Sequence, residues 1–533
     1  MTSTRSLASQ LNIKLDGVEV RPAVMSNVVG VTVDQHAHLP DMFTIRITDP
    51  ELIMLDDGPF DLTKPIEIVA EQEDGRKSIL IRGEITALEP RFGEGMEAEL
   101  VVQGFDLSHR LYRECKSRAF VNMKDSDIAA KIAQDGRLQS AIDTTATPYS
   151  HIYQDNQSDL AFLRQRAWRI GFECFVEKDT LYFRRPSVAG GVAALTWGDD
   201  LLSFQPRISL AEQVDEVIVK GWDAAKQSPI VGRAVSGRLY PDIGEPKDGA
   251  TWAKSFRLPG KLIIVDQPVA GQSEADTLAA ARLDEISGAF IEAEGIAFRR
   301  PDIKAGRGVK LEGLGKRLSG IYLVTAATHE YTPEGLRTIF AVRGTRTGTF
   351  AEQAVRRDPL TRRPGVVIGV VTNTRDPEDW GRVKVKFPWL ADDVESEWAR
   401  VVGAGAGTEA GFYAVPEVGD EVVVAFELGD INRPCVLGGL WNGRDAVPPD
   451  AAAAPAGDKP KVRVWRSRTG HCITLDDTKN KVVIVTRDGQ TITLDDSGIT
   501  LESTRDLNIK AKGNVNIEAQ GQVNVKGSLI NLN

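Results

Sequence analysis

The stretch DLNIKAKGNVNIEAQGQVNVKGSLINLN, residues 506–533, repeats a pattern of eight residues almost unchanged. In each repeat two apolar residues stand two positions apart, which is the spacing of one buried face of a β-strand. Gly513 and Gly521 mark a turn at the same place in successive repeats. The apolar pairs are Ile499/Leu501, Leu507/Ile509, Val515/Ile517 and Val523/Val525, and a last pair, Ile530/Leu532, comes one residue early. Regular repetition of this kind predicts a β-helix.

The strands of this predicted β-helix are too short for one chain to close a core around them. Three chains wound around one axis can bury every apolar pair, so we predict an intertwined trimer. The predicted trimer core comprises Ile499, Leu501, Leu507, Ile509, Val515, Ile517, Val523 and Val525. The alternative is an ordinary terminal β-meander, which the strict period of eight disfavours.

Length and composition set limits on the rest of the chain. Its 533 residues allow about three to five domains. No apolar run is long enough for a transmembrane helix, and the first residues contain no apolar signal segment, so we expect assembly in the cytoplasm. Four scattered cysteines form no disulfide framework. The net charge of −10 argues against a general nucleic-acid binder.

Two irregular segments rich in proline divide the chain, at residues 352–364 and 442–460. We expect a mainly β fold with a few helices. Residues 1–351 alternate apolar and polar positions and predict two β-barrels with interspersed helices. Helices are predicted at 127–132, at 158–170 with Gly171 at its end, and at 273–287 behind a capping pair, Ser273 and Asp276. Residues 461–533 form the predicted needle.

Residues 365–441 predict a compact all-β domain. Five short apolar strands separated by glycine-rich turns in such a small unit are typical of an OB-fold barrel. In GRVKVKFPWL, Val383, Val385 and Phe387 fall on one face of a strand and three basic residues fall on the other.

Several segments resemble a known family. DPEDWGRVKVKFPWL (376–390), WARVVGAGAG (398–407), VPEVGDEVVVAFELGDINRPCVLGGLWN (415–442) and the octads closely resemble the VgrG spike proteins of contractile injection systems. LVVQGFDLSHRL (100–111) and QDNQSDLAFLRQRAWRIGFECFV (154–176) resemble the hub region of that family, which is similar to phage tail hubs. The resemblance covers nearly the whole chain and is most specific in the OB segment.

The resemblance implies a structural role. Two tandem barrels in each of three copies would form a pseudo-sixfold ring that meets a hexameric inner-tube protein, with baseplate proteins around it. The needle would point away from the tube and carry a PAAR-type tip protein on Ile530, Asn531, Leu532 and Asn533. On contraction the spike would pierce a target envelope rather than bind it.

Two departures bear on the type of system. No lysozyme domain stands between the OB segment and the needle, and no effector domain follows the needle. Together with the short needle, these features favour a phage-tail-like extracellular particle over a type VI spike, which remains the alternative. The sequence leaves open whether the particle is released, membrane-anchored or kept inside the cell.

Enzyme motifs are weak throughout. HEYTP at His329 lacks the second histidine of HExxH, so it predicts no zinc protease. His36 and His38 lack a third ligand nearby, and Gly-rich residues 403–411 open no helix, as a phosphate loop would. Glu94, Glu97 and Glu99 have the pattern of a solvated turn. We therefore expect no catalytic site, no metal and no cofactor.

Parts of the sequence also resemble two kinds of binding protein. Single-stranded nucleic acid could use Arg382, Lys384, Lys386, Phe387 and Trp389 of the OB segment, but Phe387 falls on the apolar face. A single-chain β-helical protein that binds or degrades carbohydrate would need an acidic cluster. The tail offers only Glu502, Asp506 and Glu518 among lysines.

Replacing Ile517 by aspartate tests the inward assignment of the octads. In a trimer the substitution places three carboxylates at the axis, so we expect trimerisation of the needle to be abolished. Light scattering after size exclusion measures the mass. A variant that remains a stable trimer would show that Ile517 does not face the axis.

Overall fold

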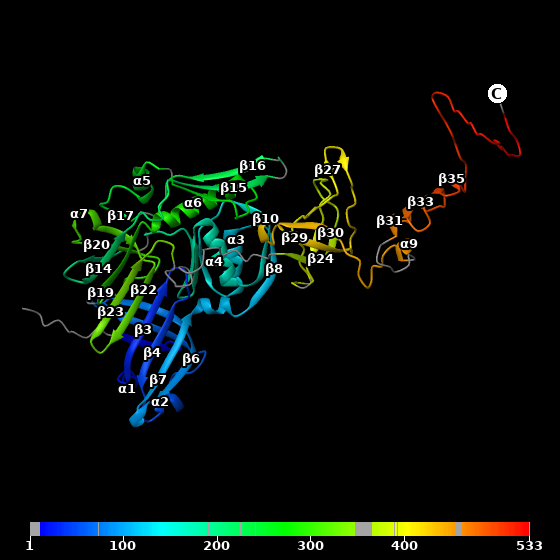
Figure 1. The fold of residues 1–533 in the computed structure, drawn as a ribbon. Coiled ribbons are helices and arrows are strands. Elements are labelled where there is room, and N and C mark those ends of the chain that lie inside the picture. Colours follow the sequence, from blue (N-terminus) through cyan, green and yellow to red (C-terminus); the bar gives the residue numbers. More distant parts are fainter. Residues whose placement is uncertain are drawn as a thin grey trace, which may run out of the picture. The chain divides into compact units, whose positions relative to one another are not determined.

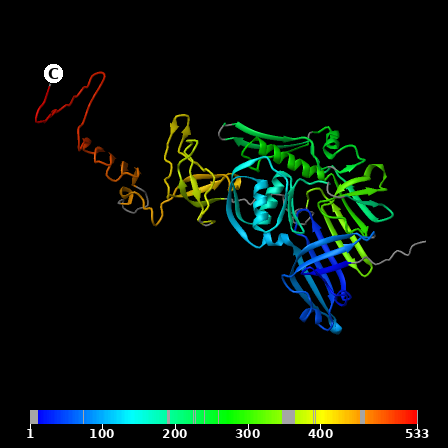
Figure 2. The ribbon, with the colours of Figure 1, turned by 180° about the vertical axis from the view of Figure 1, so that it is seen from behind.

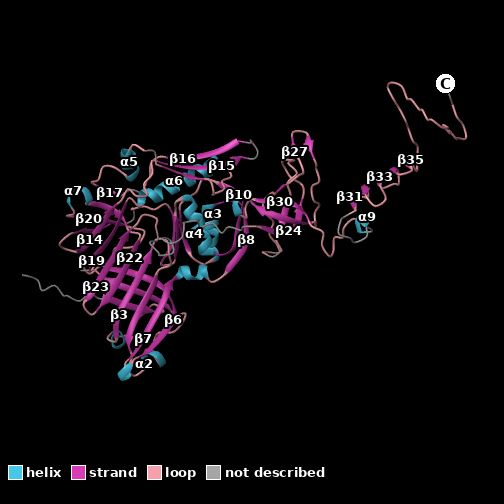
Figure 3. Cartoon of the chain, in the orientation of Figure 1, coloured by secondary structure: helices cyan, strands magenta, loops and turns pink. Residues whose placement is uncertain are grey.

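The computed structural model of the chain describes residues 11–346, 365–452 and 461–531, except 73, 189–191, 224, 225, 227, 240, 259, 389 and 392. The predicted linker 352–364 and residues 453–460 of the second predicted linker lie outside the described residues. The chain divides into two compact units, Met1–Gly439 and Leu440–Asn533. The fold is mainly β, as predicted (Figures 1 and 3). Among the described residues, every helix is too short or too polar to cross a membrane.

One eleven-stranded sheet forms the framework of the first unit. Its order is β14 (Leu201–Ile208), β19 (Ile291–Phe298), β23 (Gly335–Val342), β22 (Ala326–Thr332), β3 (Val28–His36), β4 (Met42–Thr48), β7 (Ala98–Asp106), β6 (Lys77–Phe92), β5 (Pro65–Glu71), β1 (Leu11–Leu15) and β2 (Val18–Glu19). It combines the two predicted barrel-like halves, because β22 of the second half pairs antiparallel with β3 of the first. At this seam the Thr328 hydroxyl donates to Asp34 Oδ1 over 2.6 Å.

Each half of the sheet has its own core. In β3, alternate residues such as Val31 and Val33 are buried, which is the pattern of a strand with one inner face. Val31 and Val33 pack with Phe43 in the first core, while Phe340 and Tyr322 pack in the second. Short helices lie beside the sheet: α1 (Pro22–Met25), α2 (Ile53–Asp56), η1 (Glu94–Met96) and α7 (Gly315–Leu318).

A helical insertion follows β7. It contains η2 (Leu107–Tyr112), β8 (Cys115–Lys124), α3 (Asp125–Asp135), β9 (Gln139–Ile142), β10 (Pro148–Ser158), α4 (Asp159–Ile170), β11 (Glu173–Glu177) and β12 (Thr180–Arg184). The predicted helix at 158–170 is confirmed as α4: the Ser158 hydroxyl accepts from the Ala161 N–H, and Gly171 has a φ of 71° at the end. The predicted start of α3 is two residues too late, because Asp127 accepts from the Lys124 N–H and the helix begins at Asp125.

A second module packs α6 (Gln272–Gly288) against a three-stranded sheet, in the order β16 (Ser228–Ala234), β15 (Glu216–Asp223) and β18 (Lys261–Ile264). Ser273 was predicted to cap α6, but Gly271 is the capping residue and Ser273 lies inside the helix. The module also contains α5 (Gly249–Ala253) and η3 (Lys254–Phe256). A small sheet has the order β13 (Val192–Thr196), β20 (Gly308–Glu312), β21 (Gly320–Leu323) and β17 (Asp242–Ile243).

The OB domain closes the first unit, as predicted. Its sheet has the order β25 (Lys384–Lys386), β24 (Val366–Asn373), β29 (Glu421–Phe426), β30 (Pro434–Gly439) and β26 (Arg400–Val401). A hairpin of β27 (Ala406–Gly407) and β28 (Ala410–Gly411) and a turn, η4 (Glu427–Gly429), complete it. Val383, Val385 and Phe387 are fully buried in its core, as the alternation predicted.

The second unit begins with a short helix, α9 (Pro449–Ala452). An antiparallel meander follows, with β31 (Val462–Arg466), β32 (Cys472–Asp476), β33 (Lys481–Val485), β34 (Thr491–Asp495) and β35 (Gly498–Glu502). Residues 503–531 carry no strand within the single chain. Up to Glu502, the single chain therefore forms a β-meander, which was the alternative to the predicted β-helix. Among the described residues, the octads after Glu502 form no strand pairs within the chain.

A buried ion pair joins α3 to α4 in the insertion. Arg166 Nε donates to Asp125 Oδ1 over 2.6 Å, and both side chains are buried. Replacing Arg166 by methionine leaves a buried carboxylate without its partner, so we expect α3 and α4 to lose about 3–5 kcal/mol of local stability. Native-state hydrogen exchange of their amides measures this loss.

The exposed pair between Arg46 and Glu99, at 2.7 Å, is the matched control. Replacing Arg46 by glutamine should cost less than about 1 kcal/mol at β4 and β7 because solvent screens an exposed pair. Equal effects at the two sites would contradict the stabilising role of the buried pair.

Candidate assembly surface of the tail

The meander β31–β35 has one apolar face. Strand register aligns one row of side chains across the sheet: Trp465, Ile473, Ile484, Ile492 and Leu501. A second row lies two residues away: Leu475, Val482, Leu494 and Ile499. Because side chains two apart in a strand point to the same side, both rows share one face. We call these nine residues the apolar ladder face.

The two faces of the meander differ in chemistry. The row behind the ladders consists of Val464, Thr474, Val483, Thr493 and Thr500. On the apolar ladder face, Ile492 is 39% exposed and Ile499 is 73% exposed. Exposed apolar surface of this kind, bordered by polar residues, marks an interaction site. The face therefore lacks a complete cover in the single chain.

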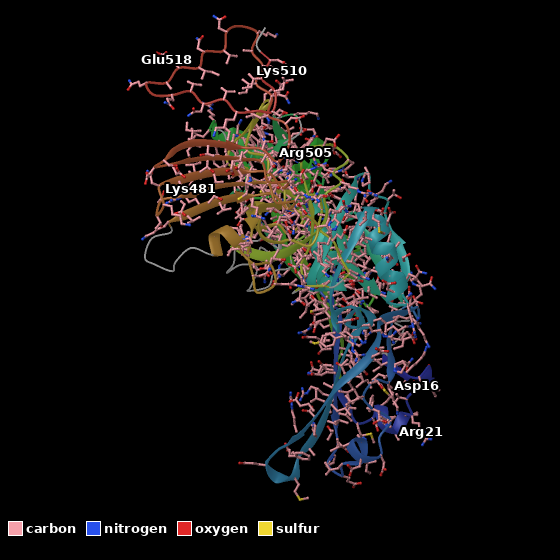
Figure 4. The ribbon with its side chains drawn as sticks, turned by 90° about the vertical axis from the view of Figure 1, so that its right-hand side faces the viewer. Asp16, Arg21, Lys481, Arg505, Lys510 and Glu518 are labelled. Carbon is pink, nitrogen blue, oxygen red and sulfur yellow. The ribbon has the colours of Figure 1, made fainter. Side chains whose placement is uncertain are left out.

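The predicted trimer core falls into two groups. Ile499 and Leu501 lie on β35 and extend the two ladders. The other six predicted residues follow on the unpaired segment and are all exposed: Leu507, Ile509, Val515, Ile517, Val523 and Val525. Figure 4 shows this segment beyond the meander, with Lys510 and Glu518 labelled on it. Of the predicted tip residues, Ile530 and Asn531 are exposed, while Leu532 and Asn533 lie outside the described residues.

The sequence prediction missed the first part of the ladder face. Ile473/Leu475, Val482/Ile484 and Ile492/Leu494 have the same two-residue spacing as the octads. Their turns differ in length, however, so the pairs do not recur at intervals of eight. The spacing within each pair, rather than the interval between pairs, was the signal that could have identified them.

A cavity of about 890 Å³ lies between the insertion and the OB domain, inside the first unit. Its lining comes from β10, α4, the start of α6 and the OB loops, and it includes Tyr149, Arg169, Trp380 and Trp398. Two of the arginines that line it form ion pairs: Arg169 pairs with Glu274 at 2.9 Å, and Arg382 pairs with Asp376 at 2.6 Å. The cavity thus presents paired charges and aromatic rings.

Strand β10 joins the insertion to the OB domain beside this cavity. The Tyr153 N–H donates to Asn432 Oδ1 over 2.6 Å, and the Tyr153 ring packs in the OB core. His151 Nε2 lies 2.8 Å from the Glu395 carbonyl oxygen. Burial lowers the pKa of His151, so the ring is neutral and Nε2 donates to that carbonyl. These contacts fix the OB domain to the hub.

The candidate catalytic and metal residues are separated or enclosed. His329 is buried in β22, and burial lowers its pKa to about 3. His36 Nδ1 accepts from the backbone N–H of His38 at 2.9 Å. In the part of the chain that the structure describes, no three His, Cys, Asp or Glu side chains are grouped as metal ligands. Residues 403–411 form the hairpin of β27 and β28.

Two of the three basic residues on the OB strand have acidic neighbours. Arg382 pairs with Asp376, and Lys384 lies 3.5 Å from Glu395. Phe387 is fully buried, so its ring cannot stack on a base, and Trp389 lies outside the described residues. At the predicted solvated turn, Glu99 pairs with Arg46. Within the described residues of this domain, the two ion pairs and the burial of Phe387 argue against the open basic and aromatic groove of a single-strand binder.

Two family models match the chain. The model of the Alg8 N-terminal domain matches residues 8–333, more than half of the chain. The model of the type VI secretion system/phage-baseplate injector OB domain matches residues 367–441.

A curated relative is the type VI secretion system spike protein VgrG1b of Pseudomonas aeruginosa, which is 38% identical over 109 residues. The match covers 18% of this chain and 15% of that protein, so the chain spans a small part of that relative.

Two solved structures share the fold. The E. coli c3393 protein, a component of the type VI secretion system with structural similarity to T4 bacteriophage tail proteins gp27 and gp5, has a TM-score of 0.53 and 14% identity, over 80% of this chain and 99% of that one. A chain of the Francisella PdpA-VgrG complex has a TM-score of 0.51 and 10% identity, over 93% and 80%. The chain belongs to the family of the Alg8 N-terminal domain, and part of it is similar to VgrG spike proteins of type VI secretion systems.

Proposed function

We propose that the chain is the trimeric hub and spike of a contractile injection apparatus. In this role three copies join the hexameric inner tube to a PAAR-type tip protein, within a baseplate, and pierce the target envelope on contraction. The observation that carries the proposal is the apolar ladder face, continued by the apolar pairs of the octads. Three such faces turned toward one axis bury each other at about 25 cal/mol per Å².

The role is structural rather than enzymatic. A spike needs stiffness along its axis, and a needle whose backbone groups pair between chains supplies it. The unpaired backbone of residues 503–531 is available for such pairing with two other copies. A single-chain carbohydrate-active β-helix is less well supported, because β31–β35 run antiparallel as a meander rather than coiling around a core of their own.

Two finer points belong to the same proposal. The particle is proposed to be of the extracellular phage-tail-like type, with a type VI spike as the alternative. Assembly is expected in the cytoplasm, and the tip protein would dock on residues 530–533.

Replacing Ile492 by aspartate tests the proposed function. The substitution places a charge on the apolar ladder face, so we expect less than a tenth of the chain to remain trimeric and the variant to be absent from purified particles. Native mass spectrometry measures the first effect. Labelled reference peptides measure the second, with three copies per wild-type particle expected.

Thr493 is the matched control because it lies one residue away, on the opposite face of β34. Replacing Thr493 by aspartate should leave both the trimer and the particle content unchanged. Particles that form and contract normally without the chain would contradict the spike function, whatever the oligomeric state.

A further inference from the structure

Part of one face of the sheet β16-β15-β18 is exposed, although Ile218 on that face is buried and Trp222 also lines the cavity between the insertion and the OB domain. Val217 and Val219 of β15 pack with α6 on the inner side. Because side chains alternate along a strand, Lys220 and Trp222 point to the other side, together with Ile263 on β18 and Val265 just after it. All four are exposed, with Trp222 at 52%. In Figures 1 and 2 these strands lie at one end of the first unit.

The segment that leads into β18 also exposes apolar and basic side chains. Phe256 and Leu258 are exposed there, beside the exposed cations Lys254 and Arg257. Within the described residues, Lys220, Lys254 and Arg257 form no ion pair. Residues 216–264 contain 8 basic and 5 acidic residues in a chain of net charge −10. We call the eight exposed residues named here the basic apolar face.

The opposite end of the first unit is rich in acidic residues. Residues 41–99 contain 15 acidic and 6 basic residues. The hairpin of β6 and β7 projects there beside α2 (Figures 1 and 4). Exposed apolar side chains lie at this end: Ile53, Phe92 and Met96. Five exposed carboxylates accompany them without an ion pair in the described structure: Glu51, Asp56, Asp57, Glu94 and Glu97. We call these eight residues the acidic apolar end.

A ring of identical copies needs two different surfaces that bind each other, because each copy contacts the next head to tail. The basic apolar face and the acidic apolar end are two such surfaces, and they lie at opposite ends of one unit. Both combine exposed apolar side chains with unpaired charges, of opposite sign. Apolar contact supplies affinity, while the charges fix the register and suppress wrong partners.

We propose that the basic apolar face of one copy binds the acidic apolar end of the next copy in the trimer. This interface rests on the proposed function, since it requires a ring of copies. It adds a contact between hubs that is separate from the needle.

Zero-length carbodiimide crosslinking of the full-length protein tests the interface. The reagent joins a lysine to a carboxylate only when the two groups touch. We expect Lys220 or Lys254 to be joined to one of the five carboxylates, within species of two or three chains on a denaturing gel. Peptide mass spectrometry identifies the joined residues.

Variants make the test specific. Replacing Lys220 and Lys254 by glutamine should lower the yield of these species at least fivefold, whereas replacing the exposed Lys316 of α7 should not. A swap provides the stronger control: Lys220→Glu and Lys254→Glu combined with Glu94→Lys and Glu97→Lys should restore the yield to within twofold.

The outcomes separate this inference from the proposed function. A trimer whose interchain crosslinks avoid both surfaces would overturn the interface and leave the spike function standing. A second outcome would assign the basic apolar face to lipid instead. In that case the trimer shows none of these crosslinks but binds vesicles of phosphatidylserine and phosphatidylcholine, and the double glutamine variant does not bind them. A monomeric wild-type protein would overturn both.

Discussion

The structure of the tail depends on how its apolar ladder face is covered. A five-stranded sheet with two apolar rows on one side cannot keep that side in water at low cost. Nothing in the strand pairing of β31–β35 closes the sheet on itself, since β31 and β35 are its two edges. In the proposed trimer this cover comes from other copies, and the octads beyond Glu502 prolong the same requirement along the chain.

In the first unit, by contrast, the apolar cores are buried within a single chain. Its eleven-stranded sheet has two buried cores, and β10 ties the insertion to the OB domain through Tyr153 and His151. The first unit thus buries its cores within one chain, whereas the tail leaves an apolar face exposed.

Much of this could be predicted from the sequence, for identifiable reasons. The alternation of apolar residues predicted the OB strand that contains Val383 and Phe387. The capping residue Ser158 and the terminal Gly171 predicted α4. Both signals are local in the sequence. The seam between β22 and β3 joins residues almost 300 positions apart, and no local pattern encodes it. The start of the ladder face was missed because turns of unequal length disturb its period, and the complementary charged ends appear only once the fold is known.

The most direct test of the central claim is the native mass of the chain with and without residues 461–533, by light scattering after size exclusion. The full chain should have three times its 58.1 kDa, about 174 kDa. The shortened chain should lose the intertwined needle and dissociate when diluted. A full chain that is a stable monomer would contradict the account, because the ladder face would then be stable in water without any partner.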